Sequence, residues 1–230
     1  PLTPTTPDRY TGLRNIWGGI PVYHAVTPRR SAEFGDTMTK IALIITSTRQ
    51  ERFADRPARW VTARLRRAGL DVDVIDMRDH DLPSFGGQSP MYTPRQYATP
   101  AIAQFGHRID QADAYIVLTS EYNHGYTGVF KNAVDHLFAE WDRKPIAFVA
   151  WGNVGGARAV EQLRSVAIEF GMAPIRPAVH ILPDVMVPAM TAPTYDAALF
   201  TALEPKLDAL VEELIWWTAT LERGRNHAQA

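Results

Sequence analysis

The 230 residues include 24 Lys and Arg against 25 Asp and Glu, so the formal net charge is −1 and the sequence offers no overall field to attract nucleic acid or an anionic membrane. There is no cysteine, which excludes disulfides, thiolate metal sites, iron–sulfur clusters and a cysteine nucleophile. A hydrophobic content of 46% can fill one large core, and no apolar run approaches the ~20 residues that cross a bilayer. We therefore expect no nucleic-acid or membrane partner, and any redox chemistry must come from a bound cofactor.

The first 37 residues differ in composition from those that follow. They hold five prolines and show no sustained periodicity, which predicts an arm or upstream extension, either a mobile tail or a segment laid over a partner subunit. They lack the basic start and apolar run of a secretory signal, so a cytoplasmic location is expected. We expect a domain over 38–195 and a C-terminal helix over 196–230, packed on the domain or at a subunit interface.

From Lys40 onward, strand-like and helix-like segments alternate along the chain. Short apolar or alternating runs predict five strands, at residues 41–46, 70–76, 114–118, 145–151 and 178–182. Segments with helical periodicity predict one helix that Gly69 ends, and further helices at about 97–111, 128–140, 156–170 and 196–223. The last helix carries an apolar stripe of Leu199, Leu203, Leu207, Leu210, Leu214 and Trp217.

This alternation predicts an α/β fold in which a doubly wound, five-stranded parallel sheet is covered by helices on both faces, as a three-layer sandwich. In such folds ligands bind beyond the carboxyl ends of the strands, where the strand order reverses. The loops after the first, third and fourth strands are therefore the informative places for function.

The loop after the first strand holds hydroxyl groups and cations just before a helix. Ser47, Thr48, Arg49 and Arg52 lie there, and hydroxyls, guanidinium groups and free helix N–H groups together favour a phosphate site. An N-cap hydroxyl and solvated arginines explain the same residues equally well. The loop has neither G-x-x-x-x-G-K nor G-x-G-x-x-G, so it predicts neither an ATP site nor a Rossmann-type NAD site.

The loop after the third strand offers backbone N–H groups, a carboxamide and an aromatic ring over residues 121–123, which suits a flat heteroaromatic ring. Gly125 and Gly128 allow a close approach to the backbone. Ordinary packing of the tyrosine and a turn made by the asparagine are the alternatives. Lys131 and Asn132 follow at a helix start, where a cation is unfavourable, and we interpret them as ties to neighbouring loops.

The loop after the fourth strand contains Gly152, Asn153, Gly155 and Gly156 between a strand and a helix. Glycines at this place expose backbone amides to a ligand. A tight turn that needs positive φ explains any one of these glycines equally well. The three loops together point to a ligand more strongly than each does alone.

Taken together, S47-T-R-Q-E-R, E121-Y-N-H-G-Y-T-G-V-F-K-N-A-V-D135 and G152-N-V-G-G156 resemble the flavodoxin-like NADPH-dependent FMN reductase family, which includes quinone, azo-dye and chromate reductases. The resemblance runs from about Lys40 to Leu182. It implies non-covalent FMN, NADPH or NADH as reductant and a small-molecule electron acceptor, with a ping-pong transfer of hydride through the flavin. The family commonly has proline where Ser120 and Thr127 stand, which predicts a looser turn here.

The resemblance also implies roles for particular residues. Ser47, Arg49 and Arg52 would hold the phosphate, residues 121–123 would line the isoalloxazine, and the glycine loop would close its pyrimidine side. The full expected cofactor-binding set is Ser47, Thr48, Arg49, Arg52, Glu121, Tyr122, Asn123, His124, Gly152, Asn153, Gly155 and Gly156. Backbone N–H groups would meet the charge on the reduced ring, so we expect no general acid or base.

The remaining polar residues predict little chemistry. His80 and His124 are interpreted as solvated loop histidines rather than edges of the pocket, and the scattered histidines lack the spacing of a metal site. Trp216 and Trp217 cannot both face one core, which predicts a homodimer or homotetramer. Residues that shape an acceptor pocket are expected in loops such as 84–96.

Two other functions remain open from the sequence. An FMN-binding electron carrier or regulatory flavoprotein with little NADPH turnover is one, although the nearly neutral charge favours the enzyme over an acidic carrier. An interaction protein that has lost its flavin is the other, and the looser turn at Ser120 and Thr127 keeps it open.

Overall fold

A computed structural model describes residues 38–228, and the arm expected over residues 1–37 lies outside the described part. The strands are β1 (Lys40–Ile45), β2 (Asp71–Asp76), β3 (Ala114–Ser120), β4 (Pro145–Trp151) and β5 (Ala173–Ile181). The helices are α1 (Asp55–Arg67), α2 (Pro100–Asp110), α3 (Gly128–Asp135), α4 (Ala157–Glu169), α5 (Pro183–Thr191) and α6 (Glu204–Ala228), with 3₁₀ turns η1 (Met77–Asp79) and η2 (Ala197–Leu203).

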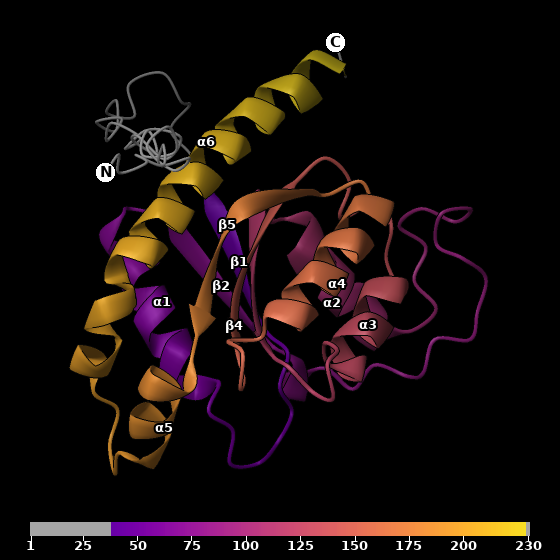
Figure 1. Cartoon of the computed structure of the whole chain (residues 1–230). Helices are drawn as coiled ribbons and strands as arrows, with labels where there is room; N and C mark the ends of the chain where they lie inside the picture. The colour runs from indigo at the N-terminus through magenta and orange to yellow at the C-terminus, as the bar shows by residue number, and fades with distance from the viewer. Residues whose placement is uncertain (1–37, 229–230) are drawn as a thin grey trace, which may run out of the picture. The chain divides into compact units, whose positions relative to one another are not determined.

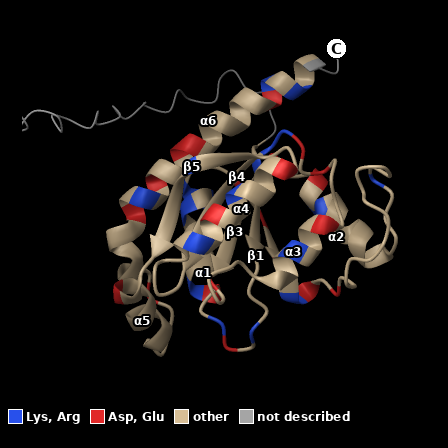
Figure 2. Ribbon diagram, turned by 45° about the vertical axis from the view of Figure 1, so that its right-hand side comes forward, with Lys and Arg blue, Asp and Glu red and all other residues tan. Residues whose placement is uncertain are grey.

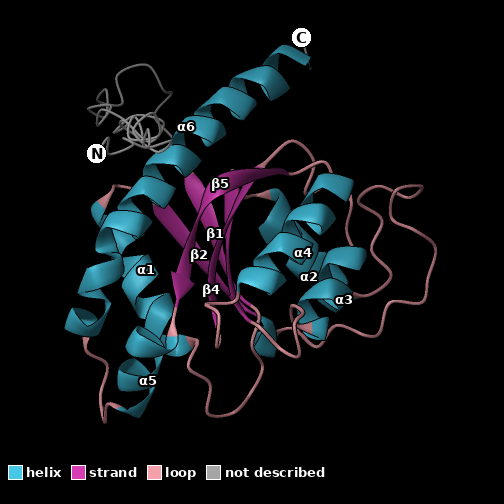
Figure 3. Cartoon of the chain, viewed as in Figure 1, coloured by secondary structure: helices cyan, strands magenta, loops and turns pink. Residues whose placement is uncertain are grey.

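The five strands form one parallel sheet in the order β2-β1-β3-β4-β5 (Figure 3). The three central strands β1, β3 and β4 are the continuous apolar runs of the sequence, and both of their faces are buried. A strand covered on both faces cannot alternate polar and apolar residues, which explains these runs.

Helices cover both faces of the sheet, and each face has its own apolar core (Figure 1). On one face, Trp60 and Leu65 of α1 and Leu207, Leu210 and Leu214 of α6 pack against alternate residues of the central strands. On the other face, Phe105 of α2, Phe130 of α3 and Leu163 of α4 pack against the remaining residues, with Tyr115 and Trp141 at the centre. The predicted α/β three-layer architecture is confirmed.

Several element boundaries differ from the predictions. β5 begins at Ala173 rather than 178, because an edge strand with a register shift against β4 tolerates Pro174 and Pro177, which hid it in the sequence. α3 ends at Asp135 rather than 140. Beyond this end, the carboxyl of the buried Glu140 accepts a hydrogen bond from the Phe138 backbone N–H, and such side-chain bonds to the backbone compete with helix formation.

Two further differences lie near the C-terminus. α5 was not predicted, since Pro188 inside it breaks the helical pattern. The predicted helix 196–223 starts as η2, capped by the Asp196 side chain, and only from Glu204 does it continue as α6. Among the described residues, no helix has the length and apolarity that a bilayer crossing requires.

The strand order reverses between β1 and β3, which are neighbours at the centre of the sheet. From β1 the chain crosses to β2 on one side, and from β3 it crosses to β4 on the other. At their carboxyl ends the two strands are joined by the bond from Thr46 N to Leu118 O, 3.0 Å, and by that between the Thr46 and Thr119 hydroxyls, 3.1 Å. A crevice for a ligand is expected at this switch point.

Candidate functional site

The loop between β1 and α1 presents unpaired donors at the switch point. Ser47 is buried at its base, whereas Thr48 and Arg49 are exposed at its tip. Within residues 38–228, the backbone N–H groups of these three residues have no hydrogen-bond acceptor. Figure 2 shows basic and acidic residues together in this loop. Successive free N–H groups beside a guanidinium group and ahead of a helix form a site suited to an anion. We call residues 47–49 the anion cradle.

Arg52 occupies a different position from the other predicted phosphate ligands. Its side chain is 1% exposed and donates to the carboxyl of Asp76 at 2.7 Å, to that of Asp55 at 2.6 Å and to the carbonyl of Ser47 at 2.6 Å. The guanidinium group therefore ties the loop to the end of β2. Of the two predicted arginines, Arg49 is the one that solvent reaches.

Asp76 is the partner that sequence reasoning missed. Burial opposes its ionisation, but hydrogen bonds from Arg52 and Arg78 outweigh that cost, so the pKa of the Asp76 carboxyl lies well below its ordinary value. Its position at the end of an alternating strand was the only signal in the sequence, because its partner lies 24 residues away.

Residues Tyr122 to Gly125 form a tight reversal after β3. The backbones of Tyr122 and Gly125 exchange two hydrogen bonds of 2.9 Å, and Asn123 and His124 between them have φ of 49° and 70°. Two central residues with positive φ are the mark of a type I′ turn. This conformation is uncommon for residues other than glycine, so neighbouring groups must hold it.

Arg158, in the first turn of α4, holds that reversal. Its backbone N–H and Nε donate to the two carboxyl oxygens of Glu121 at 3.2 Å and 2.7 Å, and Nη1 lies 2.8 Å from Nε2 of His124. A guanidinium group only donates, so His124 Nε2 accepts and its ring hydrogen lies on Nδ1. Gln162 adds a 3.0 Å bond to the His124 carbonyl. We call Glu121, His124, Arg158 and Gln162 the α4 clamp.

The α4 clamp changes the interpretation of two predicted ligands. The Glu121 side chain is 6% exposed and its carboxyl is taken up by Arg158, while its backbone N–H donates to Trp151 at 3.0 Å. Its carboxylate is thus structural. His124 is exposed but its ring is bonded to Arg158, so the ring of Tyr122 and the side chain of Asn123 are the exposed groups of the turn that the α4 clamp leaves free. The turn predicted to be looser is closed by five hydrogen bonds besides its own backbone pair.

The loop after β4 requires its glycines. Gly155 and Gly156 have φ of 66° and 72°, and a Cβ atom on them would lie 2.7 Å from the His180 Cβ and 2.6 Å from the Ala150 Cβ. The His180 ring donates from Nδ1 to the Gly155 carbonyl at 2.9 Å. Asn153 is exposed at the tip. Both the backbone conformation and the tight packing therefore exclude larger residues.

The three loops meet one another at the carboxyl edge of the sheet. The Ser47 hydroxyl lies 3.2 Å from the Tyr122 hydroxyl, which joins the first loop to the second. A Cβ on Gly152 would lie 3.2 Å from the Glu121 Cβ, so the second loop contacts the third. Tyr122 is 36% exposed between the anion cradle and the glycine loop. The arrangement can hold a flat ring that carries an anionic group.

Two buried hydroxyls flank the turn. Ser120 Oγ and Thr127 Oγ1 have no hydrogen-bond partner among the described residues. A buried hydroxyl without a partner is costly, and such groups often bind a ligand or water. These orphaned atoms and the free N–H groups of the first loop fit a polar ligand at this edge.

Three other predicted residues have clear places. Asn132 ties its helix to a neighbouring loop, as predicted: it donates to the Pro83 carbonyl at 2.8 Å and accepts from Phe85 N at 2.7 Å. Lys131 does not, because it pairs with Asp135 on its own helix. The solvated state predicted for His80 is wrong: it is buried against Phe105 and Arg108, and desolvation lowers the pKa of its ring.

Sequence comparison finds relatives over this same region. The family model described as NADPH-dependent FMN reductase matches residues 39–184. An NAD(P)H-dependent FMN reductase of Schizosaccharomyces pombe is 31% identical over 161 residues, covering 68% of this chain and 80% of that protein. One from Nectria sp is 34% identical over 132 residues, covering 55% of this chain and 66% of that protein.

Structural comparison gives the same fold. The flavoenzyme NAD(P)H:acceptor oxidoreductase of Paracoccus denitrificans superposes with a TM-score of 0.60 at 20% identity, over 77% of this chain and 97% of that one. At this identity the likeness shows the fold alone. The family match itself covers more than half of the sequence and includes all three loops. The chain belongs to the NADPH-dependent FMN reductase family.

Proposed function

We propose that the protein is an FMN-dependent NAD(P)H oxidoreductase that passes electrons to a small acceptor such as a quinone, a flavin, an azo compound or a metal oxyanion. The observation that carries this proposal is the meeting of the anion cradle, the exposed Tyr122 ring and the glycine loop at the strand switch point. Relatives support the acceptor classes, since they are named an FMN-dependent NADPH-azoreductase in Staphylococcus haemolyticus and a 2-hydroxy-1,4-benzoquinone reductase in Burkholderia sp.

Bound FMN would supply the redox step, taking a hydride from NAD(P)H in one half-reaction and passing the electrons to the acceptor in a second, ping-pong half-reaction. The free N–H groups of residues 47–49, the Ser47 hydroxyl and Arg49 would bind its phosphate, with Thr48 at the same tip. Tyr122, Asn123 and the loop of Gly152, Asn153, Gly155 and Gly156 would bind and orient the ring.

In our proposal, three of the predicted ligands do not contact the cofactor but hold in place the loops that would bind it. Arg52 fixes the first loop through Asp76, and Glu121 and His124 fix the turn through Arg158. Backbone N–H groups would stabilise the negative charge that develops on the ring edge, so no side chain is assigned as acid or base.

Anaerobic spectroscopy tests the proposal directly. The purified protein should show a flavin spectrum after FMN is added, the band should bleach when NADPH is mixed in, and a quinone should restore it. Steady-state rates should give parallel double-reciprocal plots. Bound flavin that NADPH barely reduces would instead support an electron carrier or regulatory flavoprotein, and a protein that takes up no FMN would contradict both.

Substitution of Gly155 by Ala should weaken FMN binding by at least tenfold. The new Cβ would meet the His180 Cβ at 2.7 Å in a backbone conformation with φ of 66°, so the loop must move. Gly87→Ala is the matched control, because a Cβ there has no atom within 4 Å. Quenching of FMN fluorescence gives both affinities, and equal values for the two variants would contradict the role of the loop.

We also propose that the protein is a cytoplasmic homodimer or homotetramer with residues 1–37 as a separate arm. Trp217 packs against the core, whereas Trp216 is 57% exposed beside the exposed Ile215, and an apolar surface of this kind favours a subunit contact. Trp216→Ser should lower the sedimentation mass towards that of one chain, while Trp217 remains in place. A mass of one chain for the unmodified protein would refute the proposal, and cell fractionation tests the location.

A further inference from the structure

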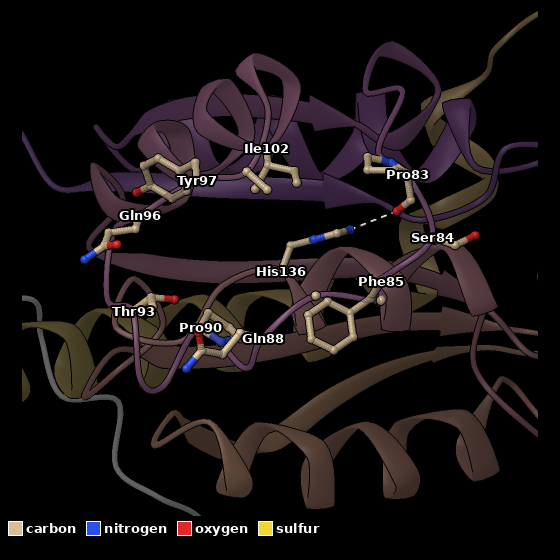
Figure 4. A pocket seen from close by; sticks show the side chains of 13 residues that line it. Pro83, Ser84, Phe85, Gln88, Pro90, Thr93, Gln96, Tyr97, Ile102 and His136 are labelled. Carbon is tan, nitrogen blue, oxygen red and sulfur yellow. Dashed lines mark hydrogen bonds between the residues drawn. The ribbon is translucent and has the colours of Figure 1, made fainter.

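A cavity of about 450 Å³ lies beside the long loop that joins η1 to α2, and none of its lining residues belongs to the three loops of the candidate site. Its volume falls in the range of roughly 300–1,000 Å³ that is typical of small-molecule sites. It is lined by Pro83, Ser84, Phe85, Gly86, Gly87, Gln88, Pro90, Thr93, Gln96, Tyr97, Ala98, Ile102 and His136 (Figure 4).

Hydrogen bonds to α3 hold the first wall of the cavity in place. The Pro83 carbonyl accepts from Asn132 Nδ2 at 2.8 Å and from His136 Nε2 at 2.9 Å, and the Phe85 N–H donates to Asn132 Oδ1 at 2.7 Å. The Phe85 ring packs edge-on against the His136 ring at 5.5 Å. The start of the loop is therefore fixed on one helix.

The second wall is fixed at the start of α2. The Tyr97 hydroxyl donates to the buried Glu140 carboxyl at 2.8 Å, and its ring packs so closely on Gly106 that a Cβ there would lie 2.6 Å away. Burial and the Glu140 carboxylate raise the pKa of this hydroxyl, which keeps its proton. Arg95 pairs with Asp110 at 3.0 Å beside it. Most of the lining residues are exposed, so the cavity is an open surface pocket, and its two anchored walls preform it.

The chemistry of the walls selects the ligand. None of the thirteen lining residues carries a formal charge when His136 is neutral. In Figure 4, Tyr97 and Ile102 lie on one side, Phe85 and Gln88 on the other, and His136 lies between them. A carbonyl oxygen only accepts, so His136 donates from Nε2, and its Nδ1 is the nitrogen left to accept a hydrogen bond.

The carboxamides of Gln88 and Gln96 complete the polar groups, and within residues 38–228 neither makes a side-chain hydrogen bond. We propose that this cavity binds an uncharged, planar aromatic compound of one or two rings that carries a hydroxyl group. The rings would lie against Phe85 and Tyr97, and the hydroxyl would pair with His136 or a carboxamide. Loops such as 84–96 were expected to shape an acceptor pocket, but none of the lining residues belongs to the three loops of the candidate site. We therefore assign the cavity to a second ligand, separate from the acceptor, and this goes beyond the proposed reductase function.

Calorimetry with 2-naphthol and 2-naphthoate tests the site on the full chain saturated with FMN. We expect 2-naphthol to bind saturably with one site per chain, and the anionic 2-naphthoate to bind at least tenfold more weakly, because no cation lines the described cavity to offset its desolvation. Equal affinity for the two compounds, or the absence of saturable binding of 2-naphthol, would overturn the proposal.

Two variants locate the binding. Ala98→Trp fills the cavity and Gln88→Glu adds a negative charge without a change of size, so each should weaken 2-naphthol binding at least tenfold. Met91→Trp is the matched control, since Met91 is exposed in the same loop but does not line the cavity. Undiminished binding in both cavity variants would overturn the proposal. The Gly155→Ala variant should keep 2-naphthol binding while its FMN binding weakens at least tenfold, which separates this result from the reductase function.

Discussion

Replacing Asp76 by Asn should lower the free energy of unfolding at pH 7 by about 3 kcal/mol, the cost of breaking a buried ion pair. Arg52 is 1% exposed and Asp76 only 14%, so the remaining guanidinium charge would keep Asp55 as its only carboxylate partner. Because Asp76 also receives a bond from Arg78, the end of β2 loses two contacts at once. Urea unfolding of the variant and its parent measures the difference.

The pH dependence of that difference has a definite sign. Burial opposes ionisation of Asp76, and the bonds from Arg52 and Arg78 lower its pKa below the ordinary 3.8. A carboxyl with a lowered pKa in the folded state stabilises the protein above the unfolded pKa and loses that effect as the pH falls. The gap between Asp76→Asn and its parent should therefore be constant from pH 7 to about 5 and shrink below pH ~4.

Asp79→Asn is the control for Asp76, because it lies three residues further on, is exposed and makes no ion pair within residues 38–228. It should change the free energy of unfolding by less than about 0.5 kcal/mol, as exposed substitutions usually do. If both variants lost the same stability, or if the gap for Asp76→Asn stayed unchanged at pH 3, the Arg52 network would not stabilise this loop.

The central sheet and the meeting of the three loops at the candidate site could be predicted because both follow from local patterns. The runs that became β1, β3 and β4 are apolar throughout, and only a strand buried on both faces needs that composition. Parallel strands bring their carboxyl ends to one edge, so the loops after them had to meet. The first half of the proline-bearing edge strand β5 and the helix α5 escaped prediction because their prolines break the periodicity on which such predictions rest.

What could not be predicted is which charged groups face the ligand and which face each other. In the sequence, Arg52 and Glu121 have the chemistry of ligands. In the structure, however, Arg52 bonds Asp76, which lies 24 residues away, and Glu121 bonds Arg158, which lies 37 residues away. No local pattern records such a pair. A helix-start arginine with a glutamine four residues on was the one available sign of the α4 clamp, and the same spacing occurs on any solvated helix face.

Arg158→Gln should raise the dissociation constant for FMN about 10- to 100-fold while the fold persists. The substitution removes the Nε bond to Glu121 and the Nη1 bond to His124, and a hydrogen bond to a charged group contributes roughly 1.5–3 kcal/mol. His124 would then lose the bond that holds it at a φ of 70°, and the Tyr122–Gly125 reversal would open. In the proposed site Arg158 would thus be a positioning residue, whose effect would reach the flavin only through the turn.

Arg158→Lys and Arg164→Gln separate positioning from general stability. Lysine keeps the charge and one bond to Glu121 but cannot reach two partners at once from one planar group, so it should recover only part of the affinity. Arg164 lies on the same helix and bonds Glu161 and the Arg176 carbonyl, away from the three loops, so its loss should lower stability without changing FMN affinity. FMN titration and urea unfolding on each variant measure both quantities. If Arg158→Gln weakened FMN binding no more than Arg164→Gln at equal loss of stability, the α4 clamp would serve folding alone, and the turn would hold its shape without it.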